Sequence, residues 1–588
     1  MDVEQRELYL RVINNVMLFF GLLVLVSLLF EHGFYVAQDT LQTLHYFDYA
    51  VLFGFILHDF LKLALVRNKR TFLQYNWLNF VFFVFLFIFF LLYNPWWQFP
   101  LLSQSLKNMP VRSIAKIYIL ITQIYLLFAT IFSTIKFGQK YAFARLKPLQ
   151  ILLGSFILII LIGAGLLMLP KATTGHYISF VDALFTSTSA TCVTGLIVVD
   201  TGTFFTRFGQ WVILLLIQLG GLGIMTMAAF FAVILGTRMS IRERVIMRDL
   251  LSDESMAKIG QTLWQVLGLT MFIEGVGVVA IYELIPQGSV PTGDKLFFSI
   301  FHAISAFCNA GFSTLSDSLM GFSDQIMLVS TFGLLIILGG IGFPVLVNLL
   351  GHRFYGTTGP LGKKKLRVNM QTHIVLGVTV FLIVFGAIWI WISNFGLAGS
   401  GQLNFHTILA SFFQSITART AGFNTIDIGA MTIPAIMGII ALMFIGASPG
   451  STGGGVKTTT FFLSVQAIWT QLTGKPKSEY RHRTIPPQLL TRSMMLILAA
   501  AILVFTSFTL LTFFEHQNPM KLFFETVSAF GTVGLSMGAT PELSTTGRII
   551  ITITMYLGRV GPMAFIIALG RRQKKHNYEY PEESVMLG

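Results

Sequence analysis

Four segments of the chain share one pattern, which begins with LFTSTSATCVTGL at residues 184–196. The others are IFHAISAFCNAGF at 300–312, SFFQSITARTAGF at 411–423 and FFETVSAFGTVGL at 523–535. Each has Phe in second place, a piece rich in Ser, Thr and Ala, and a Gly before the final Leu or Phe. The glycines are 116, 111 and 112 residues apart, which indicates a fourfold repeat. The third copy aligns without a gap but has Ile416 and Thr417 where the others have Ser-Ala.

A second signature lies in the apolar run that follows each glycine. It reads QLGGLG at 218–223, ILGGIG at 337–342, FIGASP at 444–449 and YLGRVG at 556–561. Each repeat is therefore a span, a half-length polar segment and a second span, with repeats at 148–257, 258–370, 371–487 and 488–588. A half-length segment that enters and leaves a membrane on one side must be buried in protein or line a water-filled path. The pattern predicts four such segments around one pore.

The composition places the chain in a membrane. Of its 588 residues 54% are hydrophobic and 11% charged, and mean hydropathy is +0.74, whereas soluble domains have about 25% charged residues. Apolar runs long enough to cross a bilayer recur along the chain. The first, near 12–30, lacks a cleavage site and is interpreted as a permanent helix rather than a signal peptide. The fold class predicted is an all-α polytopic membrane protein.

The net charge of +14 does not point to nucleic acid, because the basic residues are gathered in every second loop between spans. By the positive-inside rule these loops and both termini are cytoplasmic. Membrane lipid is the surrounding partner. The only cysteines, Cys192 and Cys308, make neither a disulfide framework nor a metal site on their own.

Four further spans, near 12–30, 47–66, 77–94 and 113–136, precede the repeats. They predict an N-terminal four-helix membrane domain at 1–147 that weakly resembles a voltage sensor. A working sensor needs several spaced arginines in the membrane field, and the fourth span continues IYILITQIYLLF without them. We therefore expect an accessory domain beside the pore.

The repeated glycines predict an ion filter. A filter replaces the hydration shell of an ion with backbone carbonyl oxygens, and glycine allows the backbone turns that such carbonyls need. The short helix before each glycine would point its negative end at the axis and favour a cation. The alternative is that these are packing glycines in a helical bundle. The predicted filter residues, with K+ at their carbonyls, are Val193, Thr194, Gly195, Asn309, Ala310, Gly311, Thr420, Ala421, Gly422, Thr532, Val533 and Gly534.

The stretch GASPGSTGGGVKTTT at 446–460 interrupts the second span of the third repeat only. A polar coil at that depth cannot face lipid, so we expect it to lie against the pore and to act as a gate. In the fourth repeat Arg559 replaces Gly221 or Gly340 of the signature and can hydrogen-bond the carbonyls of this stretch. A passive helix kink and a buried ion pair remain the alternatives. The predicted gate residues are Gly446, Ser448, Gly450, Gly453, Gly454, Gly455, Lys457 and Arg559.

Two further charged groups fall in membrane segments. Arg419 lies inside the third loop and should face away from the axis, with Glu525 as its candidate partner. Glu274, within MFIEGVGVV, should face the protein interior.

The fourfold unit resembles the superfamily of Trk, Ktr and HKT potassium transporters. NAGF, RTAGF, YLGRVGPM and the tail RRQKKHNYEYPEESVMLG look especially like the Trk/Ktr membrane subunit. The resemblance covers roughly residues 148–588. It implies a potassium-selective uptake protein of the plasma membrane that forms a homodimer with one pore per chain. It also implies a gating loop in the second span of the third repeat, at 446–460, and a cytoplasmic ring of nucleotide-binding regulatory subunits. Because a serine in the first loop accompanies sodium permeability in the family, Gly195 implies potassium selectivity.

A polytopic membrane chain could also be a coupled secondary transporter or an intramembrane enzyme. A Na+- or H+-coupled secondary transporter would show paired broken helices in two inverted halves, whereas this chain has one break among four parallel repeats. An intramembrane enzyme is disfavoured because the spans carry no HExxH motif and no comparable catalytic set. No GxxxxGK[ST] phosphate-binding loop occurs in the sequence, so ATP or ADP would act only through the regulatory partner. We expect no covalently bound cofactor.

Overall fold

The computed structural model describes residues 148–223, 259–291, 293–354, 368–396 and 404–561, with scattered positions between residues 23 and 57. Apart from those positions, the four expected N-terminal spans and the C-terminal tail lie outside the described residues. The chain divides into two compact units. One is Met1–Arg145 with Leu169–Tyr177, and the other is Leu146–Met168 with Ile178–Gly588. Within the first, Lys171 Nζ donates to the carbonyl of Glu31 at 2.6 Å.

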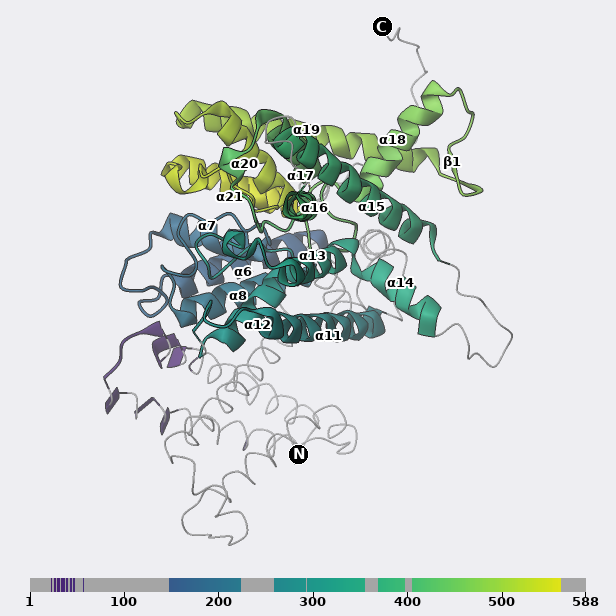
Figure 1. Ribbon diagram of the computed structural model, residues 1–588. Coiled ribbons are helices and arrows are strands. Elements are labelled where there is room, and N and C mark those ends of the chain that lie inside the picture. The colour runs from purple at the N-terminus through teal and green to yellow at the C-terminus, as the bar shows by residue number, and fades with distance from the viewer. Residues whose placement is uncertain are drawn as a thin grey trace, which may run out of the picture. The chain divides into compact units, whose positions relative to one another are not determined.

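The described part of the second unit is almost entirely helical, as predicted (Figure 1). Its first half contains α6 (Pro148–Leu167), α7 (Phe180–Thr191), α8 (Arg207–Gly221), α11 (Ile259–Leu284), α12 (Lys295–Phe307), η2 (Met320–Phe322), α13 (Ile326–Ile341) and α14 (Phe343–Phe354). Its second half contains α15 (Met370–Ile390), the π-helical η3 (Trp391–Gly396), α16 (Phe405–Thr417), η4 (Ile428–Ala430), α17 (Ile433–Phe444), α18 (Thr458–Leu472), α19 (Pro487–Phe514), α20 (Pro519–Gly531), η5 (Thr540–Glu542) and α21 (Thr545–Val560). A small antiparallel hairpin pairs β1 (Glu479–Tyr480) with β2 (Arg483–Thr484) between α18 and α19.

Hydroxyl caps start the helices that follow the short polar segments. Thr206 begins α8, Thr432 begins α17 and Ser544 begins α21, each accepting a bond from the amide three residues on. Such a cap satisfies one of the otherwise unpaired amides of a helix start. Of the short helices, α7 is capped by Ser179 and α20 by Asn518, again through the side chain. Side-chain caps therefore mark the start of both helices in the first and fourth repeats, whereas Asp294 before α12, Gln325 before α13 and Asn404 before α16 make none.

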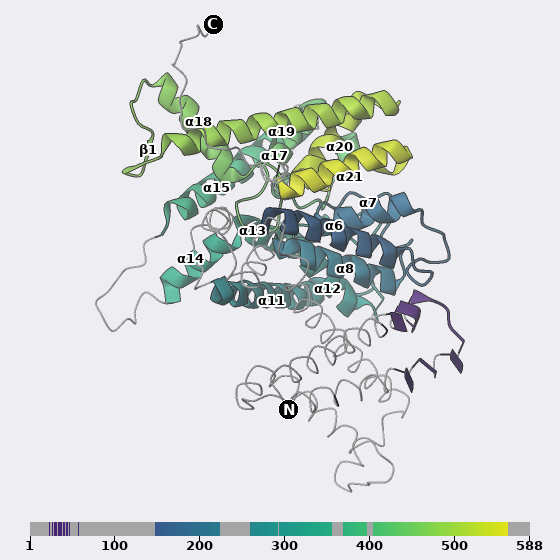
Figure 2. The same cartoon turned by 180° about the vertical axis from the view of Figure 1, so that it is seen from behind.

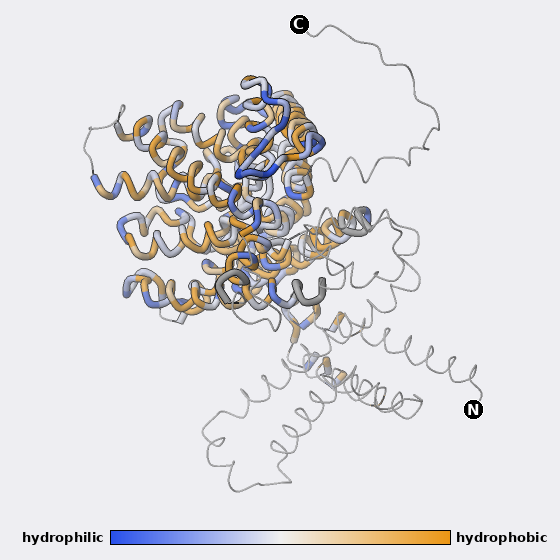
Figure 3. The backbone as a smooth tube through the Cα atoms, turned by 90° about the vertical axis from the view of Figure 1, so that its right-hand side faces the viewer, coloured by the Kyte–Doolittle hydropathy of each residue, from blue (hydrophilic) through white to orange (hydrophobic). Residues whose placement is uncertain are grey.

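Several helices can cross a membrane. Among the described residues, Trp264–Leu284, Met370–Gly396 and Pro487–Phe514 are long and apolar enough, and the bent pair α13 and α14 is a fourth candidate. Hydrophobic colour runs along most helices of the second unit (Figure 3). Large apolar side chains such as Phe381, Phe385 and Trp389 are exposed, which a lipid-facing surface requires because lipid is itself apolar.

Four apolar cores connect the repeats in a cycle. They join the first repeat to the second, the second to the third, the third to the fourth, and the fourth back to the first. Members of these cores, in the same order, are Ile217 with Phe307, Phe332 with Phe423, Met443 with Phe530, and Phe185 with Leu522. Within the second unit, α6, α8, α11 and α12 lie together on one side, and α18 to α21 lie together on the opposite side (Figures 1 and 2).

Candidate functional site

Each of the four repeated segments folds as a short helix that ends in a loop of one conformation. The short helices are α7, α12, α16 and α20. Two residues before each key glycine the backbone is left-handed, with φ of 59° at Val193, 59° at Asn309, 77° at Thr420 and 49° at Thr532. The glycines have φ of 90°, 69°, 81° and 91°. Three of the four left-handed residues, Val193, Thr420 and Thr532, are β-branched, and a left-handed conformation at such a residue is unusual and costs energy, which is typical of functional loops.

The four key glycines form a closed ring. A Cβ atom added to Gly195 would lie 2.3 Å from the carbonyl oxygen of Ala310, and one on Gly311 would lie 2.7 Å from that of Ala421. The series continues with 2.5 Å from Gly422 to Val533 and returns with 2.1 Å from Gly534 to Thr194. Each glycine therefore abuts the carbonyl just before the next one. The structure brings all twelve predicted filter residues together, and only glycine leaves room for this approach.

The third segment has a different register from the one assumed in the sequence alignment. The residue before the key glycine donates its amide to a carbonyl five positions back in three repeats: Thr194 to Ser189, Ala310 to Ser305 and Val533 to Ser528. In the third repeat Ala421 donates to Thr417, only four positions back. The ungapped alignment was therefore wrong. One residue is missing after Thr417, and Thr417-Ala418 occupies the place of Ser-Ala.

The first glycine of the second signature has a clear packing role. A Cβ on Gly220 would lie 2.0 Å from the carbonyl oxygen of Thr191, and one on Gly339 would lie 1.8 Å from that of Phe307. Gly558 repeats this contact in the fourth repeat, against Phe530 at 2.0 Å. In these three repeats the second helix thus packs directly on the backbone at the end of the short helix. Any side chain would push the two apart.

The second span is interrupted in more than the third repeat, contrary to expectation. Helices α13 and α14 are bent by 96° at a single residue, Gly342, whose φ is +97°. Gly223 and Gly561, the last signature residues of the first and fourth repeats, also have positive φ and follow the ends of α8 and α21. In the third repeat Pro449 stands at this place and a longer loop replaces the bend. The predicted break is the largest of several departures from a straight helix.

This longer loop comprises residues 445–457, because α18 already begins at Thr458. Backbone hydrogen bonds join it to the bend in the second repeat. Ser448 N donates to Gly340 O at 3.1 Å, and Phe343 N donates to Gly450 O at 3.0 Å. The 445–457 loop is therefore a fixed structure in this state rather than a loose coil.

The same loop contacts the glycine ring. The amide of Gly454 donates to the hydroxyl of Thr532 at 2.9 Å. A Cβ on Gly453 would lie 2.1 Å from the hydroxyl oxygen of Thr420. Two of the four left-handed ring residues therefore rest directly on the 445–457 loop.

Two cations, the buried Arg559 and the partly buried Lys457, bind carbonyls of this loop. The guanidinium of Arg559 is 4% exposed and donates to the carbonyl oxygens of Thr452 and Gly220. Lys457 Nζ donates to Gly453 O at 2.6 Å and to Gly454 O at 3.4 Å. Arg559 thus connects the loop of the third repeat with helices of the first and fourth. Hydrogen bonds thus hold six of the predicted gate residues next to the ring, namely Ser448, Gly450, Gly453, Gly454, Lys457 and Arg559.

Comparison with known proteins identifies the family. The model of the family described as "TrkH: Cation transport protein" matches residues 118–578. Ktr system potassium uptake protein B of Bacillus subtilis (strain 168) is 40% identical over 461 residues, which is 77% of this chain and 100% of the relative. The chain belongs to the TrkH family. This is a family of membrane transport proteins and not of enzymes, so the chain is a multi-pass membrane protein.

One further relative and one solved structure resemble the chain. The "Potassium/sodium uptake protein NtpJ" of Enterococcus hirae is 35% identical over 459 residues, covering 76% of this chain and 99% of the relative. The crystal structure of the potassium transporter TrkH from Vibrio parahaemolyticus matches with a TM-score of 0.59 at 18% identity, over 84% of this chain and 97% of that one. At that identity the likeness concerns the fold alone.

The predicted partnership of Arg419 with Glu525 is wrong. In this TrkH-family chain Arg419 Nη2 lies 3.4 Å from the hydroxyl of Thr379. Glu525 instead accepts four bonds from the loop after its own glycine, from Ser536 Oγ at 2.6 Å, Met537 N at 3.0 Å, Ala539 N at 3.3 Å and Thr540 Oγ1 at 2.7 Å. Its carboxylate therefore fixes residues 536–540 after the fourth glycine, because the amides and hydroxyls of that segment donate the hydrogen bonds that a buried carboxylate needs.

Glu274 faces the interior, as expected. It is 4% exposed, and Gln218 Nε2 donates to Glu274 Oε2 at 3.2 Å. The thiol of Cys308 lies 3.8 Å from the other carboxylate oxygen. Both cysteines are free and buried. This carboxylate therefore joins α8, α11 and the end of α12 behind the second loop.

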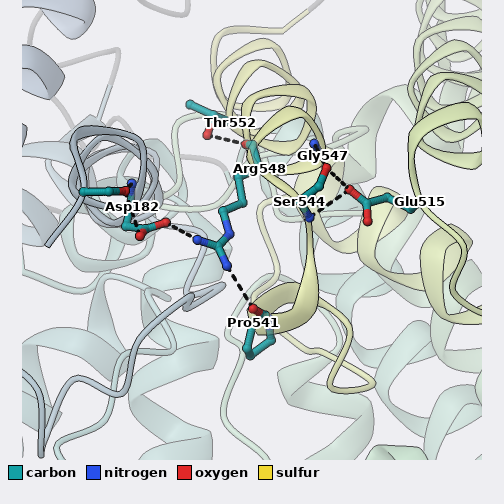
Figure 4. Close-up of polar contacts among 8 residues, drawn as sticks. Asp182, Glu515, Pro541, Ser544, Gly547, Arg548 and Thr552 are labelled. Carbon is teal, nitrogen blue, oxygen red and sulfur yellow. Dashed lines mark hydrogen bonds and ion pairs between the residues drawn. The ribbon is translucent and has the colours of Figure 1, made fainter.

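An ion pair that the sequence analysis missed joins the two ends of the cycle. Arg548, in the first turn of α21, pairs with Asp182 in the first turn of α7 and donates to Pro541 O at 3.0 Å (Figure 4). Beside it, Glu515 accepts bonds from Ser544 N at 3.0 Å and Ser544 Oγ at 2.6 Å. The partners are 366 residues apart, and no local pattern indicates such a pairing.

Proposed function

We propose that the chain is a potassium-selective uptake protein that conducts K+ through the ring of the four glycine loops. The four repeats would surround one pore, with the ring as its filter. The observation that carries this proposal is the closed glycine ring, which brings four peptide loops to one axis. Carbonyl groups held at such a point replace the water shell of a cation. The names of the relatives in Bacillus subtilis and Enterococcus hirae support potassium as the ion.

The 445–457 loop and Arg559 would form the gate. The loop contacts Thr420 and Thr532 of the ring, and in this proposal it would lie in the path of an ion that leaves the ring along its axis. Arg559 and Lys457 add positive charge at the same level, which raises the barrier for a cation. In this proposal the observed state is closed, and conduction requires the loop to move aside.

Regulation would come from outside the chain. The Ktr system named for the Bacillus subtilis relative, together with the family resemblance, supports a cytoplasmic ring of nucleotide-binding subunits and a homodimer in the plasma membrane with cytoplasmic termini. The basic side chains around the hairpin, Lys475, Lys477, Arg481 and Arg483, are exposed and would offer a cationic surface to that ring. Flux through the purified chain alone should then not respond to ATP or ADP, and a response would contradict this assignment.

Ion flux in liposomes tests the filter and the gate together. Uptake of K+, Rb+, Na+ and Li+ is compared for the native chain, for Gly195→Ser and for a deletion of residues 450–455. We expect K+ and Rb+ flux in the native chain, reduced selectivity in Gly195→Ser, and increased flux in the deletion. Gly165→Ser is the matched control, because no atom lies within 4 Å of a Cβ at Gly165.

The second candidate is a Na+- or H+-coupled potassium transporter, which the potassium/sodium name of the Enterococcus relative favours. It predicts flux that requires a Na+ or H+ gradient and is insensitive to Gly195→Ser. That outcome would replace the channel-like mechanism.

A further inference from the structure

A buried serine hydroxyl holds the first loop from behind. Ser189, at the end of α7, is fully buried. Its Oγ accepts a bond from the amide of Gly195 at 3.1 Å and donates to the carbonyl oxygen of Leu196 at 2.7 Å. The hydroxyl thus fixes the backbone on both sides of the key glycine.

The equivalent serines of the second and fourth repeats make the same kind of contact. Ser305 Oγ donates to the carbonyl oxygen of Phe312 at 2.8 Å. Ser528 Oγ accepts from the amide of Gly534 at 3.1 Å. Both side chains are fully buried. Three loops therefore carry one hydroxyl clamp each, placed six residues before the key glycine.

The third loop has no such clamp. Its missing residue brings Thr417 to the serine position, and within the described part of the chain the buried hydroxyl of Thr417 has no hydrogen-bond partner. Both amide atoms of Gln414 and the Nε of Arg419, in and just after the same helix, also lack partners. The amide of Gly422 reaches only the carbonyl oxygen of Thr417, at 3.5 Å. The buried polar groups behind the third loop thus lack hydrogen bonds, where the other three loops have a bonded serine.

We propose that Ser189, Ser305 and Ser528 are positioning residues that set ion selectivity. In this proposal the third loop is the one of the four filter loops whose backbone shifts most easily. This inference rests on the proposed function. A clamp acts through the glycine backbone and not on the ion, because each hydroxyl bonds to main-chain atoms. Loss of one clamp frees the carbonyls around one key glycine to adjust to a smaller ion.

The unclamped loop is also one that the 445–457 loop supports. Thr420 has its hydroxyl against Gly453 on one side and 3.3 Å from the side-chain amide of Asn309 on the other. When the 445–457 loop moves aside, Thr420 of the third loop and Thr532 of the fourth loop both lose that contact, but the fourth loop keeps its Ser528 clamp. Opening of the gate therefore affects two loops and leaves the third without a clamp or a contact to the 445–457 loop.

Single hydroxyl deletions test this inference. K+/Na+ selectivity is measured in liposomes for Ser189→Ala, Ser305→Ala and Ser528→Ala, and for Thr417→Val, which removes a hydroxyl without a partner. A net hydrogen bond corresponds to a factor of about two to ten, so we expect each serine variant to lose selectivity by about that factor and Thr417→Val to stay within about twofold of the native chain. Ser299→Ala is the matched control, because the buried Ser299 hydroxyl bonds only to Lys295 O of its own helix.

Each possible result for the selectivity of these variants either supports or overturns the inference. Native selectivity in all three serine variants, or an equal loss in Thr417→Val, overturns the inference. Failure of the proposed function looks different, since then the native chain shows no selective K+ flux and Gly195→Ser changes nothing. A serine variant that does not fold is replaced by Ser→Cys at the same position, which keeps only a weak donor and acceptor.

Discussion

Replacement of Arg559 by Met tests the strongest electrostatic contact of the gate. The guanidinium donates to the carbonyl of Thr452 in the 445–457 loop and to that of Gly220 at the end of α8. Met has a similar length and no donor. The variant therefore removes both bonds and the charge, while it still fills much of the space.

The expected magnitude follows from these bonds. A hydrogen bond to a charged group contributes about 1.5–3 kcal/mol, and of the two bonds only the one to Thr452 O holds the 445–457 loop, because Gly220 lies in α8. Among the described residues the buried Nε of Arg559 has no partner, and that desolvation offsets part of the gain. A net value of about 1.5 kcal/mol corresponds to roughly a tenfold change in the closed-to-open ratio. Flux should rise by up to this factor, limited by the fraction of channels already open.

Rubidium uptake into liposomes at equal protein content measures this change. Arg559→Lys keeps the charge and one donor group, so it should give an intermediate rise. Arg492→Met, at an exposed position of α19, should leave flux unaltered. A folded Arg559→Met protein with native or lower uptake would refute the assignment of Arg559 to the gate.

Three further predictions concern stability, measured as thermal unfolding in detergent. Glu525→Gln should lower the free energy of unfolding by about 2–4 kcal/mol, since an amide group would face donors that now bond a carboxylate; an unchanged melting temperature would contradict this. Gly339→Ala should cost at least about 1–3 kcal/mol, because its Cβ would lie 1.8 Å from a carbonyl oxygen. The neighbouring Gly340→Ala, which meets only a side chain at 3.3 Å, should cost less, and equal costs would refute the packing argument. A double-mutant cycle of Asp182→Asn and Arg548→Gln should give a coupling of about 1 kcal/mol, and additive effects would show that the ion pair contributes nothing.

The sequence predicted the repeated parts of the structure well. The spacing of the key glycines identified the residues that meet in the ring, because identical local patterns fold alike. Their role as a filter remains a proposal. The stretch after α17 was correctly predicted as a non-helical break, since glycine and serine there favour turns over a helix.

The remaining features depend on information that one sequence does not contain. A one-residue deletion after Thr417 is hidden because Ile416 and Thr417 fill the ungapped alignment. The bend at Gly342 resembles an ordinary helical glycine until φ is known. Glu525 bonds to its own loop rather than to Arg419. A linear sequence does not show which donors surround a buried carboxylate, so it could not distinguish between these two. Asp182 and Arg548 meet only through the whole fold.

The cyclic order of the repeats has a consequence for synthesis in the membrane. Asp182 in α7 and the Leu153 carbonyl in α6 find their partners, Arg548 and Tyr556, only in α21, 366 and 403 residues later. At about 5–20 residues per second, the ribosome needs on the order of 20–80 s to supply them. During that interval the Asp182 carboxylate lacks its cationic partner and keeps the hydrogen bond from the Ser179 hydroxyl, at 2.8 Å. Emergence of the last helix is then the step that commits the nascent chain to a closed ring, and chains truncated before it would be expected to reach quality control instead.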